Sequence, residues 1–337
     1  MNDFKAIDFK GDKLFLIDQT KLPLKEEYIS TDDYERIAEA IERLEVRGAP
    51  AIGVSASYAL ALAVKQNSKY IESKFLQIVD RLASTRPTAV NLFWALERMQ
   101  KVFQLNKENK NLYEILLNEA KKIHNEDVEM CEKIGENGFE IFKKKSVVLT
   151  HCNTGKLATG GNGTAFNVIN YGFKNGMVEH VFADETRPLL QGSRLTAFEL
   201  SKAGIPFSIN TDSTAAFLMQ HGKIDLVITG ADRIAVNGDS ANKIGTYNLA
   251  VLCKHHNIPF YIAAPTSTID KNCLNGDEIT IEFRNKAEIN SIRNCQITST
   301  DYEVYSPAFD VTPNNLITGI ITERDLHKFP YNFTTLI

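Results

Sequence analysis

A cysteine at the end of a predicted strand is the residue with the most direct chemical potential in this sequence. Val147–Leu149 is an apolar run typical of a buried strand, and Cys152 comes just after it. Four glycines follow between residues 155 and 163, and a helical apolar pattern begins at Thr164. Such units open parallel α/β sheets, whose ligands lie beyond the carboxyl ends of the strands. A helix start there favours anions and thiolates, so Cys152 is a candidate catalytic residue, and a buried apolar cysteine is the alternative.

Charged and amide side chains near other predicted element ends form a second group of candidates. Asp232 follows a short apolar strand in the sequence TGAD, and Gln191 opens a predicted helix. Arg47 and Arg86 lie just before helix starts, and Lys243 lies in a predicted loop before a helix that could hold a phosphate. Taken singly, each has a plain alternative as a capping residue, a surface ion pair or a solvated lysine. Together they indicate a site for an anionic ligand.

The glycine-rich turn matches a dinucleotide-binding fingerprint only in part. Gly161 and Gly163 supply the first two glycines, but Phe166 stands where the third is needed for close helix–strand packing. Asp184 falls at a strand end about 20 residues later, as a ribose-binding acid would, although it also fits a turn-shaping role. A nicotinamide-dependent dehydrogenase therefore stays open as an alternative.

Composition narrows the classes of protein that the chain can belong to. The 337 residues are 43% hydrophobic and 24% charged, with a net charge of −4, which is typical of a globular protein and does not favour nucleic-acid or membrane binding. No apolar run is long enough to cross a bilayer, and the N-terminal residues do not resemble a signal or transit peptide. Five scattered cysteines argue for a reducing cytoplasm, and no metal-binding motif is present. We expect a cytoplasmic protein without a metal.

The first part of the chain is predicted to be mainly helical. Residues 1–24 fit a small β element, with a strand in KLFLIDQT. Apolar residues then recur at helical spacing, and Gly135 offers a natural helix stop. The predicted helices span residues 34–44, 51–66, 71–83, 90–104 and about 112–134. We interpret residues 1–125 as a mainly helical N-terminal domain.

Strands and helices alternate in the second part. Predicted strands cover residues 147–149, 178–183, 207–209, 226–228 and 259–263, and predicted helices begin at Thr164 and cover 190–203, 214–220 and 245–256. Repeated β-α units of this kind predict a parallel sheet with helices on both faces. Residues 126–337 are therefore expected to form a Rossmann-like, doubly wound α/β domain. Its C-terminal tail would complete a sheet edge or make a subunit contact.

An ordered set of motifs resembles the methylthioribose-1-phosphate isomerase family, which is related to regulatory subunits of the translation initiation exchange factor and to ribose-1,5-bisphosphate isomerase. The motifs are RGAPAIG (47–53), TRPTAVNL (85–92), THCN (150–153), LATGGNGTA (157–165), ADETRPLLQGSRLTAFEL (183–200), TGADRIAVNGDSANKIGTYNLA (229–250) and APTSTID (264–270). The resemblance implies a two-domain homodimer. It also implies aldose–ketose isomerisation of 5-methylthioribose 1-phosphate to 5-methylthioribulose 1-phosphate in methionine salvage.

The same resemblance assigns roles to particular residues, with no cofactor and no metal. Cys152 and Asp232 would be the catalytic pair. The residues that would hold the sugar and its phosphate are Arg47, Gly48, Ala49, Arg86, Gln191, Asn242 and Lys243. Because phosphate blocks the anomeric oxygen, the enzyme must assist ring opening. Asp232 in its protonated form would donate to the ring oxygen, and Cys152 would act as base at C2 or stabilise a hydride shift.

Two alternatives to this reaction follow from the resemblance itself. The substrate could be a related pentose 1-phosphate such as 5-deoxyribose 1-phosphate, because the sequence departs from the usual family pattern at Thr154, Lys156 and Phe283. A non-catalytic, sugar-phosphate- or nucleotide-binding regulatory relative is the other alternative. Such a relative would be expected to lack the Cys152–Asp232 pair.

Overall fold

The computed structural model describes residues 4–67, 71–87, 89–293 and 295–336, so Thr88 of the TRPTAVNL motif lies outside the described residues. The chain forms two compact units. The helical unit contains residues 2–133 and 154–163, and the sheet unit contains residues 134–153 and 164–337. The glycine-rich segment after Cys152 thus belongs to the helical unit. The domain boundary predicted at 125/126 stays a prediction.

The helical unit combines a small antiparallel sheet with helices, as predicted. Its strands are β1 (Ile7–Lys10), β2 (Lys13–Ile17) and β3 (Tyr28–Thr31), paired in the order β1-β2-β3. Its helices are α1 (Tyr34–Glu42), α2 (Ala49–Gln66), α3 (Ile71–Ala83), α4 (Val90–Asn106) and the first part of α5 (Leu112–Gly138). The bounds of α3 are those expected from its apolar spacing. β3 was not predicted, because Tyr28–Thr31 is short and half polar.

Helix α2 is the buried centre of the helical unit. Every residue from Ala51 to Val64 is buried, which its small side chains allow, and Pro50 lies in the first turn as predicted. A Cβ at Gly53 would lie 2.8 Å from the Asn91 carbonyl oxygen, so the first turns of α2 and α4 approach closely. The arginines that precede these two helix starts therefore come from neighbouring elements.

Helix α5 continues past Gly135, where the sequence predicted a stop, and ends at Gly138. A Cβ at Gly135 would lie 2.6 Å from the Asn167 side chain, and one at Gly138 would lie 2.3 Å from the Val168 side chain. Both glycines thus permit close packing against the helix that carries Asn167 and Val168. The prediction was wrong because glycine is used here for close approach and not for a left-handed cap.

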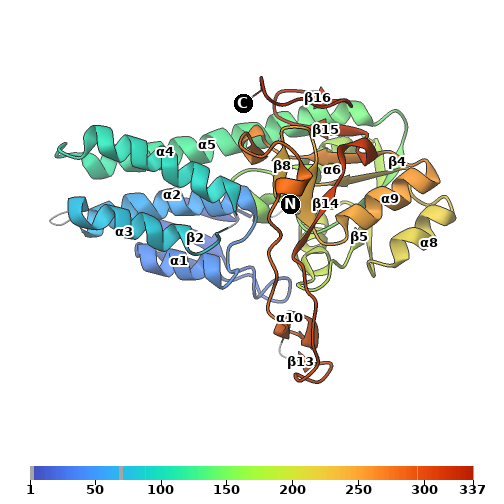
Figure 1. The fold of residues 1–337 in the computed structure, drawn as a ribbon, viewed down its shortest axis with the longest axis horizontal. Helices are drawn as coiled ribbons and strands as arrows, with labels where there is room; N and C mark the ends of the chain where they lie inside the picture. The colour runs from blue at the N-terminus through green and yellow to red at the C-terminus, as the bar shows by residue number, and fades with distance from the viewer. Residues whose placement is uncertain (1–3, 68–70, 88, 294, 337) are drawn as a thin grey trace. The chain divides into compact units, whose positions relative to one another are not determined.

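The main sheet of the sheet unit is doubly wound, as expected (Figure 1). Its strands are β4 (Ser146–Thr150), β5 (Val178–Asp184), β6 (Phe207–Asn210), β7 (Leu226–Thr229), β10 (Phe260–Ala263), β15 (Gly319–Ile321) and β16 (Leu326–His327). The order is β16-β15-β10-β7-β4-β5-β6, and only the edge strand β16 is antiparallel. Chain order reverses between β4 and β7, which makes that pair the topological switch point where such sheets bind ligands.

Helices cover both faces of this sheet, because strand residues alternate between two cores. Leu149, Val227 and Ile262 share a core with α8 (Thr214–Gln220) and α9 (Thr246–His256). Val148, Ile228 and Ala263 share the opposite core with α6 (Ala165–Lys174) and α7 (Ala197–Ala203). Gly204 ends α7 in the left-handed conformation predicted for it. The period of two in a parallel strand buried on both faces explains this division.

A second, smaller sheet was not predicted. It has the order β11-β8-β9-β14, formed by β11 (Ile269–Asp270), β8 (Arg233–Ala235), β9 (Ser240–Lys243) and β14 (Phe309–Thr312). These strands are short, and β9 buries three polar residues, Ser240, Asn242 and Lys243. Apolar periodicity cannot reveal a strand of that composition.

Two further features bear on the class of protein. All five cysteines fall within the described residues, and none of them is in a disulfide. Within the described ranges, no helix combines the length and apolar character that spanning a bilayer requires. The C-terminal tail supplies β15 and β16 at one edge of the main sheet, as expected.

Candidate active site

Cys152 and Asp232 follow the two strands that flank the switch point. Strands β4 and β7 are hydrogen-bonded neighbours in parallel register, with Leu149 opposite Val227. Cys152 comes after β4 and is 6% exposed. Asp232 comes after β7, is half-buried, and donates its backbone N–H to the Ala241 carbonyl at 2.9 Å. The topology therefore brings both predicted catalytic residues to the ligand-binding edge of one sheet.

The backbone of Cys152 is held in the left-handed region, with φ of 64°. Its N–H donates to Thr186 Oγ1 at 2.8 Å, and its carbonyl accepts from Thr196 Oγ1 at 2.6 Å. Thr186 is itself left-handed, at φ 66°, which is unusual for a β-branched residue. Such strain costs on the order of 1–3 kcal/mol per residue and persists where the surroundings fix it. Here the two threonine hydroxyls fix the conformation of Cys152.

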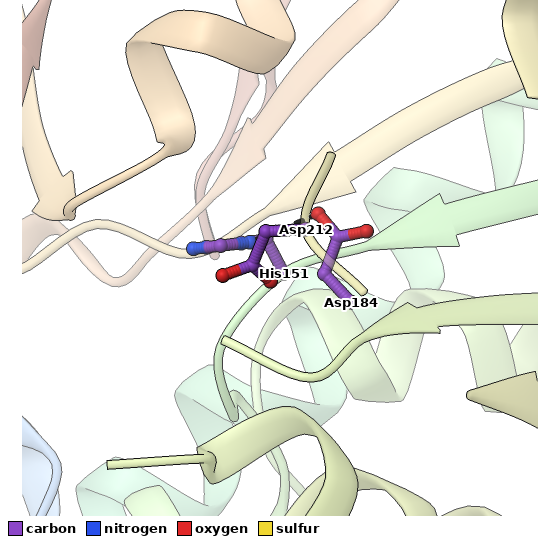
Figure 2. Close-up of side chains that lie close together, drawn as sticks. All are labelled: His151, Asp184 and Asp212. Carbon is purple, nitrogen blue, oxygen red and sulfur yellow. Dashed lines mark hydrogen bonds and ion pairs between the residues drawn. The ribbon is translucent and has the colours of Figure 1, made fainter. Parts of the chain in front are cut away.

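His151 lies at the centre of a buried polar network (Figure 2). Its Nδ1 is 3.0 Å from Asp184 Oδ2, and its Nε2 is 2.9 Å from the Ile244 carbonyl oxygen. Asp184 also accepts from Asn210 Nδ2 at 2.7 Å. Asp212 accepts from the backbone N–H groups that follow β5, Thr186 at 2.7 Å and Arg187 at 2.8 Å. This network was not predicted, although His151 stands in the THCN motif, Asp184 ends β5 and Asp212 follows β6.

Opposite charges govern the protonation of His151. Burial alone would lower its pKa, but the hydrogen bond and charge of Asp184, the charge of Asp212 and the Ile244 carbonyl together raise the pKa above its ordinary value. These partners therefore favour the charged form of the imidazole, while burial also raises the pKa of Asp184.

The three side chains of Figure 2 place their ligand-type atoms within 4.8 Å of one another, a spacing that a metal ion could use. Each of these atoms already has a protein partner. Both nitrogens of His151 face acceptors, and the oxygens of Asp184 and Asp212 accept from side-chain or backbone N–H groups. The arrangement is that of a structural hydrogen-bond network.

Asn242 and Lys243 end strand β9, so the loop predicted for Lys243 was wrong. The lysine is not solvated either: it is 8% exposed, its Nζ donates to the Ala308 carbonyl at 2.9 Å, and it lies 4.3 Å from the Phe309 ring centroid. The start of α9, predicted as a phosphate site, is occupied by Asp310, which accepts from the N–H groups of Gly245 at 2.7 Å and Tyr247 at 3.0 Å. At the end of β9, the Lys243 ammonium is therefore the group that could bind a phosphate, because Asp310 occupies the start of α9.

Gln191 precedes a π-helical turn, Gly192–Thr196, that leads into α7. The side chain is 4% exposed, and its Oε1 has no hydrogen-bond partner among the described residues. A buried amide oxygen in this state is costly, and a ligand that donates a hydrogen bond would satisfy it. This observation is consistent with the predicted substrate-binding role of Gln191.

The other predicted binding residues belong to the helical unit. Arg47 and Gly48 directly precede α2, Ala49 begins it, and Arg86 precedes α4. Gly48 has φ of 93°, and a Cβ there would lie 2.4 Å from Ala158 backbone atoms. The RGAP segment thus packs directly against the glycine-rich segment 154–163. The structure places Cys152, Gln191, Asp232, Asn242 and Lys243 in the sheet unit, and Arg47, Gly48, Ala49 and Arg86 in the helical unit.

One face of α5 holds the glycine-rich segment. Asp127 accepts from the Gly160 N–H at 2.6 Å, and His124 Nε2 donates to the Gly160 carbonyl at 3.0 Å. A Cβ at Gly161 would lie 2.8 Å from Val128 Cα, so this position requires glycine. The N–H of Gly161, the first glycine of the partial fingerprint, also hydrogen-bonds to Asp127, which weighs against pyrophosphate binding there and so against the dehydrogenase alternative.

Asp127→Asn is expected to change how stability depends on pH. Burial raises the pKa of Asp127 to about 6, in spite of the Gly160 and Gly161 N–H groups. The folded protein thus binds this proton more tightly than the unfolded chain, and this group lowers stability as pH rises from about 4 to about 6. The shift corresponds to roughly 3 kcal/mol at most. Thermal unfolding between pH 4.5 and 7.5 should therefore show Asp127→Asn gaining stability relative to wild type as pH rises.

An exposed carboxyl in the same unit provides the control for that measurement. Asp80→Asn should leave the pH dependence of the unfolding temperature as it is in the wild type. An Asp127→Asn profile parallel to the wild-type profile would contradict the interpretation of Asp127.

A family model described as the initiation factor 2 subunit family matches residues 45–327. The chain belongs to this family. A protein of Caldicellulosiruptor saccharolyticus named methylthioribose-1-phosphate isomerase is 52% identical over 331 residues, covering 97% of each chain. The family predicted from the ordered motifs is confirmed.

Solved structures of two relatives carry different names. The 5-methylthioribose 1-phosphate isomerase of Pyrococcus horikoshii OT3 superposes with a TM-score of 0.91 at 42% identity, covering 98% of this chain and 94% of that one. A structure described as translation initiation factor eIF-2B, subunit delta, from A. fulgidus gives a TM-score of 0.85 at 43% identity, covering 98% and 97%. Both likenesses confirm the fold, and the two names define the functional choice.

Proposed function

We propose that this chain is an aldose–ketose isomerase that converts 5-methylthioribose 1-phosphate to 5-methylthioribulose 1-phosphate. The observation that carries the proposal is the placement of Cys152 and Asp232 after adjacent strands at the switch point, in a chain 52% identical to a protein named methylthioribose-1-phosphate isomerase. A thiol and a carboxyl group at that edge can serve one sugar ring as a pair of proton-transferring groups.

The reaction requires ring opening before hydrogen moves. Asp232 donates a proton to the ring oxygen, and the bond from that oxygen to C1 breaks while the phosphate stays on the C1 oxygen. Hydrogen then passes from C2 to C1, and the C2 hydroxyl gives its proton to the Asp232 carboxylate as C2 becomes the ketone, which restores the Asp232 acid. Cys152 carries the C2 proton, or stabilises the transition state if hydrogen moves as hydride. The sum is an isomerisation, so no oxidant, reductant or cofactor is consumed.

Cationic side chains are the phosphate-binding groups in this proposal. Arg47 and Arg86 suit the task because a guanidinium matches a phosphate with paired hydrogen bonds, and each precedes a helix start. Lys243 adds a third cation at the end of β9. Gly48 and Ala49 contribute backbone N–H groups, and Asn242 and Gln191 bind sugar hydroxyls. The buried Gln191 Oε1 without a partner supports the last assignment.

The alternatives differ in what they bind or turn over. A 5-deoxyribose 1-phosphate isomerase would use the same groups on a smaller C5 substituent. A regulatory relative is supported by the 43% identity to the A. fulgidus structure described as an initiation-factor subunit, and it would bind nucleotide without turnover. Cys152 and Asp232 favour the enzyme, because regulation alone does not require that pair.

Turnover on a panel of pentose 1-phosphates separates these functions. The panel should contain 5-methylthioribose, 5-deoxyribose and ribose 1-phosphates, and thermal-shift assays should add guanine and nicotinamide nucleotides. We expect the highest kcat/KM on the methylthio sugar and no nucleotide-induced stabilisation. Preference for the deoxy sugar would select the related isomerase, and nucleotide binding without turnover would select the regulatory class.

We further propose a cytoplasmic homodimer acting in methionine salvage. The excursion that carries α10 (Ala287–Asn290), β12 (Ser291–Ile292) and β13 (Cys295–Gln296) extends from the sheet unit in Figure 1. Near its base the rings of Phe283 and Tyr305, 56% and 83% exposed, form an edge-on pair with centroids 5.1 Å apart. A second copy that covers these rings would account for their exposure. Light scattering should give twice 37.7 kDa, and a monomer mass would contradict the dimer.

A further inference from the structure

His151 differs from the partly buried His124 in what its two ring nitrogens face. Tyr58 OH lies 3.1 Å from His124 Nδ1, and the Gly160 carbonyl lies 3.0 Å from Nε2, so one donor and one acceptor satisfy a neutral ring. Burial accordingly lowers the pKa of His124. At His151 both partners are acceptors, the Asp184 carboxylate and the Ile244 carbonyl. A neutral imidazole beside an ionised Asp184 would leave one of these contacts without a hydrogen.

Asp184 connects this ring to the backbone of Cys152. Its side chain contacts His151 Nδ1 at 3.0 Å, while its carbonyl oxygen accepts from Thr186 Oγ1 at 2.9 Å. The same Thr186 hydroxyl accepts the Cys152 N–H at 2.8 Å. Asp184, at the end of β5, is therefore linked both to the His151 ring and, through Thr186, to the backbone of Cys152.

The other side of the ring is tied to the segment that follows Lys243. The Ile244 carbonyl accepts from His151 Nε2 at 2.9 Å, and a Cβ at Gly245 would lie 3.0 Å from His151 Cε1. Ile244 N–H in turn donates to the Ala308 carbonyl, which also accepts from Lys243 Nζ. The imidazole thus sits between the segment of the thiol and the segment of the lysine.

We propose that His151 and Asp184 form a charged pair that positions the Cys152 thiol relative to Lys243, with His151 acting as a positioning residue. The pair holds one proton more than a neutral imidazole and a carboxylate. It neutralises part of the negative charge of the three carboxyl groups that face it, Asp184, Asp212 and Asp310. This inference rests on the proposed isomerase activity, although two of its tests do not require turnover.

The kinetic test uses His151→Gln and Asp184→Asn, with His327→Gln as the matched control. His327 belongs to the same unit and bonds through one ring nitrogen to Thr322 Oγ1 at 3.0 Å. A shift of the thiol by about 1 Å relative to the sugar should lower kcat about 10²-fold in both test variants, with KM within a few-fold of wild type. The control should keep wild-type kcat. Wild-type kcat in folded His151→Gln and Asp184→Asn would overturn the proposal, because a purely structural role changes only the unfolding temperature.

Two further readouts are independent of the substrate. Iodoacetamide labelling, followed by peptide mass spectrometry, should modify Cys152 at least several-fold faster in the test variants, while the buried Cys253 stays protected. In ¹⁵N-histidine spectra at pH 7.5, the His151 signals, identified by their loss in His151→Gln, should show both nitrogens protonated, unlike those of His124. A neutral His151 ring would overturn the proposal. An unchanged labelling rate in Asp184→Asn would also overturn it, and this result does not require that His151→Gln folds. Absence of wild-type turnover with both readouts as expected would refute only the isomerase function.

Discussion

Cys152→Ala is expected to lower kcat by about 10³-fold or more while the unfolding temperature stays close to that of wild type. Positioned proton-transferring groups contribute about 10²–10⁴-fold each, and alanine removes the sulfur without adding bulk. The backbone N–H and carbonyl of residue 152 are hydrogen-bonded at 2.8 and 2.6 Å, and both bonds can persist in the variant because alanine keeps these groups. Steady-state turnover of 5-methylthioribose 1-phosphate, with thermal unfolding of the same samples, measures both effects.

The exposed Cys295 provides the matched control, since it belongs to the separate two-stranded sheet β12-β13 and not to the main sheet. Asp232→Asn should cause a comparable loss, because asparagine cannot donate an acidic proton to the ring oxygen. A measurement on wild type separates the two possible roles of Cys152. Solvent-deuterium incorporation at C1 indicates proton transfer through Cys152, and its absence indicates a hydride shift. Near-wild-type turnover in either Cys152→Ala or Asp232→Asn would refute the assigned roles.

Gly192→Ala is expected to give the largest loss of stability. A Cβ at this position would lie 1.6 Å from the Asp184 carbonyl oxygen and 3.0 Å from Thr186 Oγ1. Because the first of these atoms is backbone at the end of β5, the strand end or the π-helical turn must move. We expect a destabilisation of about 3 kcal/mol or more, which lowers the unfolding temperature by roughly 6–12 °C.

A glycine with open space around it calibrates this effect. Gly222 has φ of 62° and no atom within 4 Å of a built Cβ, so Gly222→Ala tests only the backbone conformation, at a cost of about 1 kcal/mol. Differential scanning fluorimetry of both variants suffices. If Gly192→Ala unfolds no earlier than Gly222→Ala, the close packing of the π-helical turn against β5 is not as the structure describes it.

Sequence patterns predicted the fold well where local signals were strong. The bounds of α3 and α8 were predicted to the residue, because apolar spacing and clear flanking residues define them. The α/β alternation predicted a parallel sheet, and its switch point explains why residues after β4 and β7 serve as site candidates. The resemblance supplied the particular sugar, which no spacing of residues could have indicated.

Features that depend on long-range contacts escaped prediction. Three of the four buried residues of strand β9 are polar, so the sequence predicted a loop at Lys243. The carboxylate that occupies the start of α9 comes from Asp310, 65 residues from Gly245. Likewise the partners of His151 lie 33 and 93 residues away, at Asp184 and Ile244. One sequence gives no signal for such pairs, because only the folded backbone brings them together.

The left-handed conformations of Cys152 and Thr186 were also beyond prediction. Both residue types disfavour positive φ, so the sequence predicts neither position. Strain of this kind occurs where the surroundings fix a group for function. It distinguishes Cys152 from the other buried cysteines more clearly than its place after a strand does.

The isomerase claim is tested most directly by following 5-methylthioribose 1-phosphate, labelled with ¹³C at C1, by NMR in the presence of the wild-type protein. We expect the anomeric C1 signal to disappear and the signal of a methylene carbon still coupled to phosphorus to take its place, with no inorganic phosphate released. An unchanged C1 signal at high protein concentration, or loss of the coupling to phosphorus through phosphate release, would contradict it.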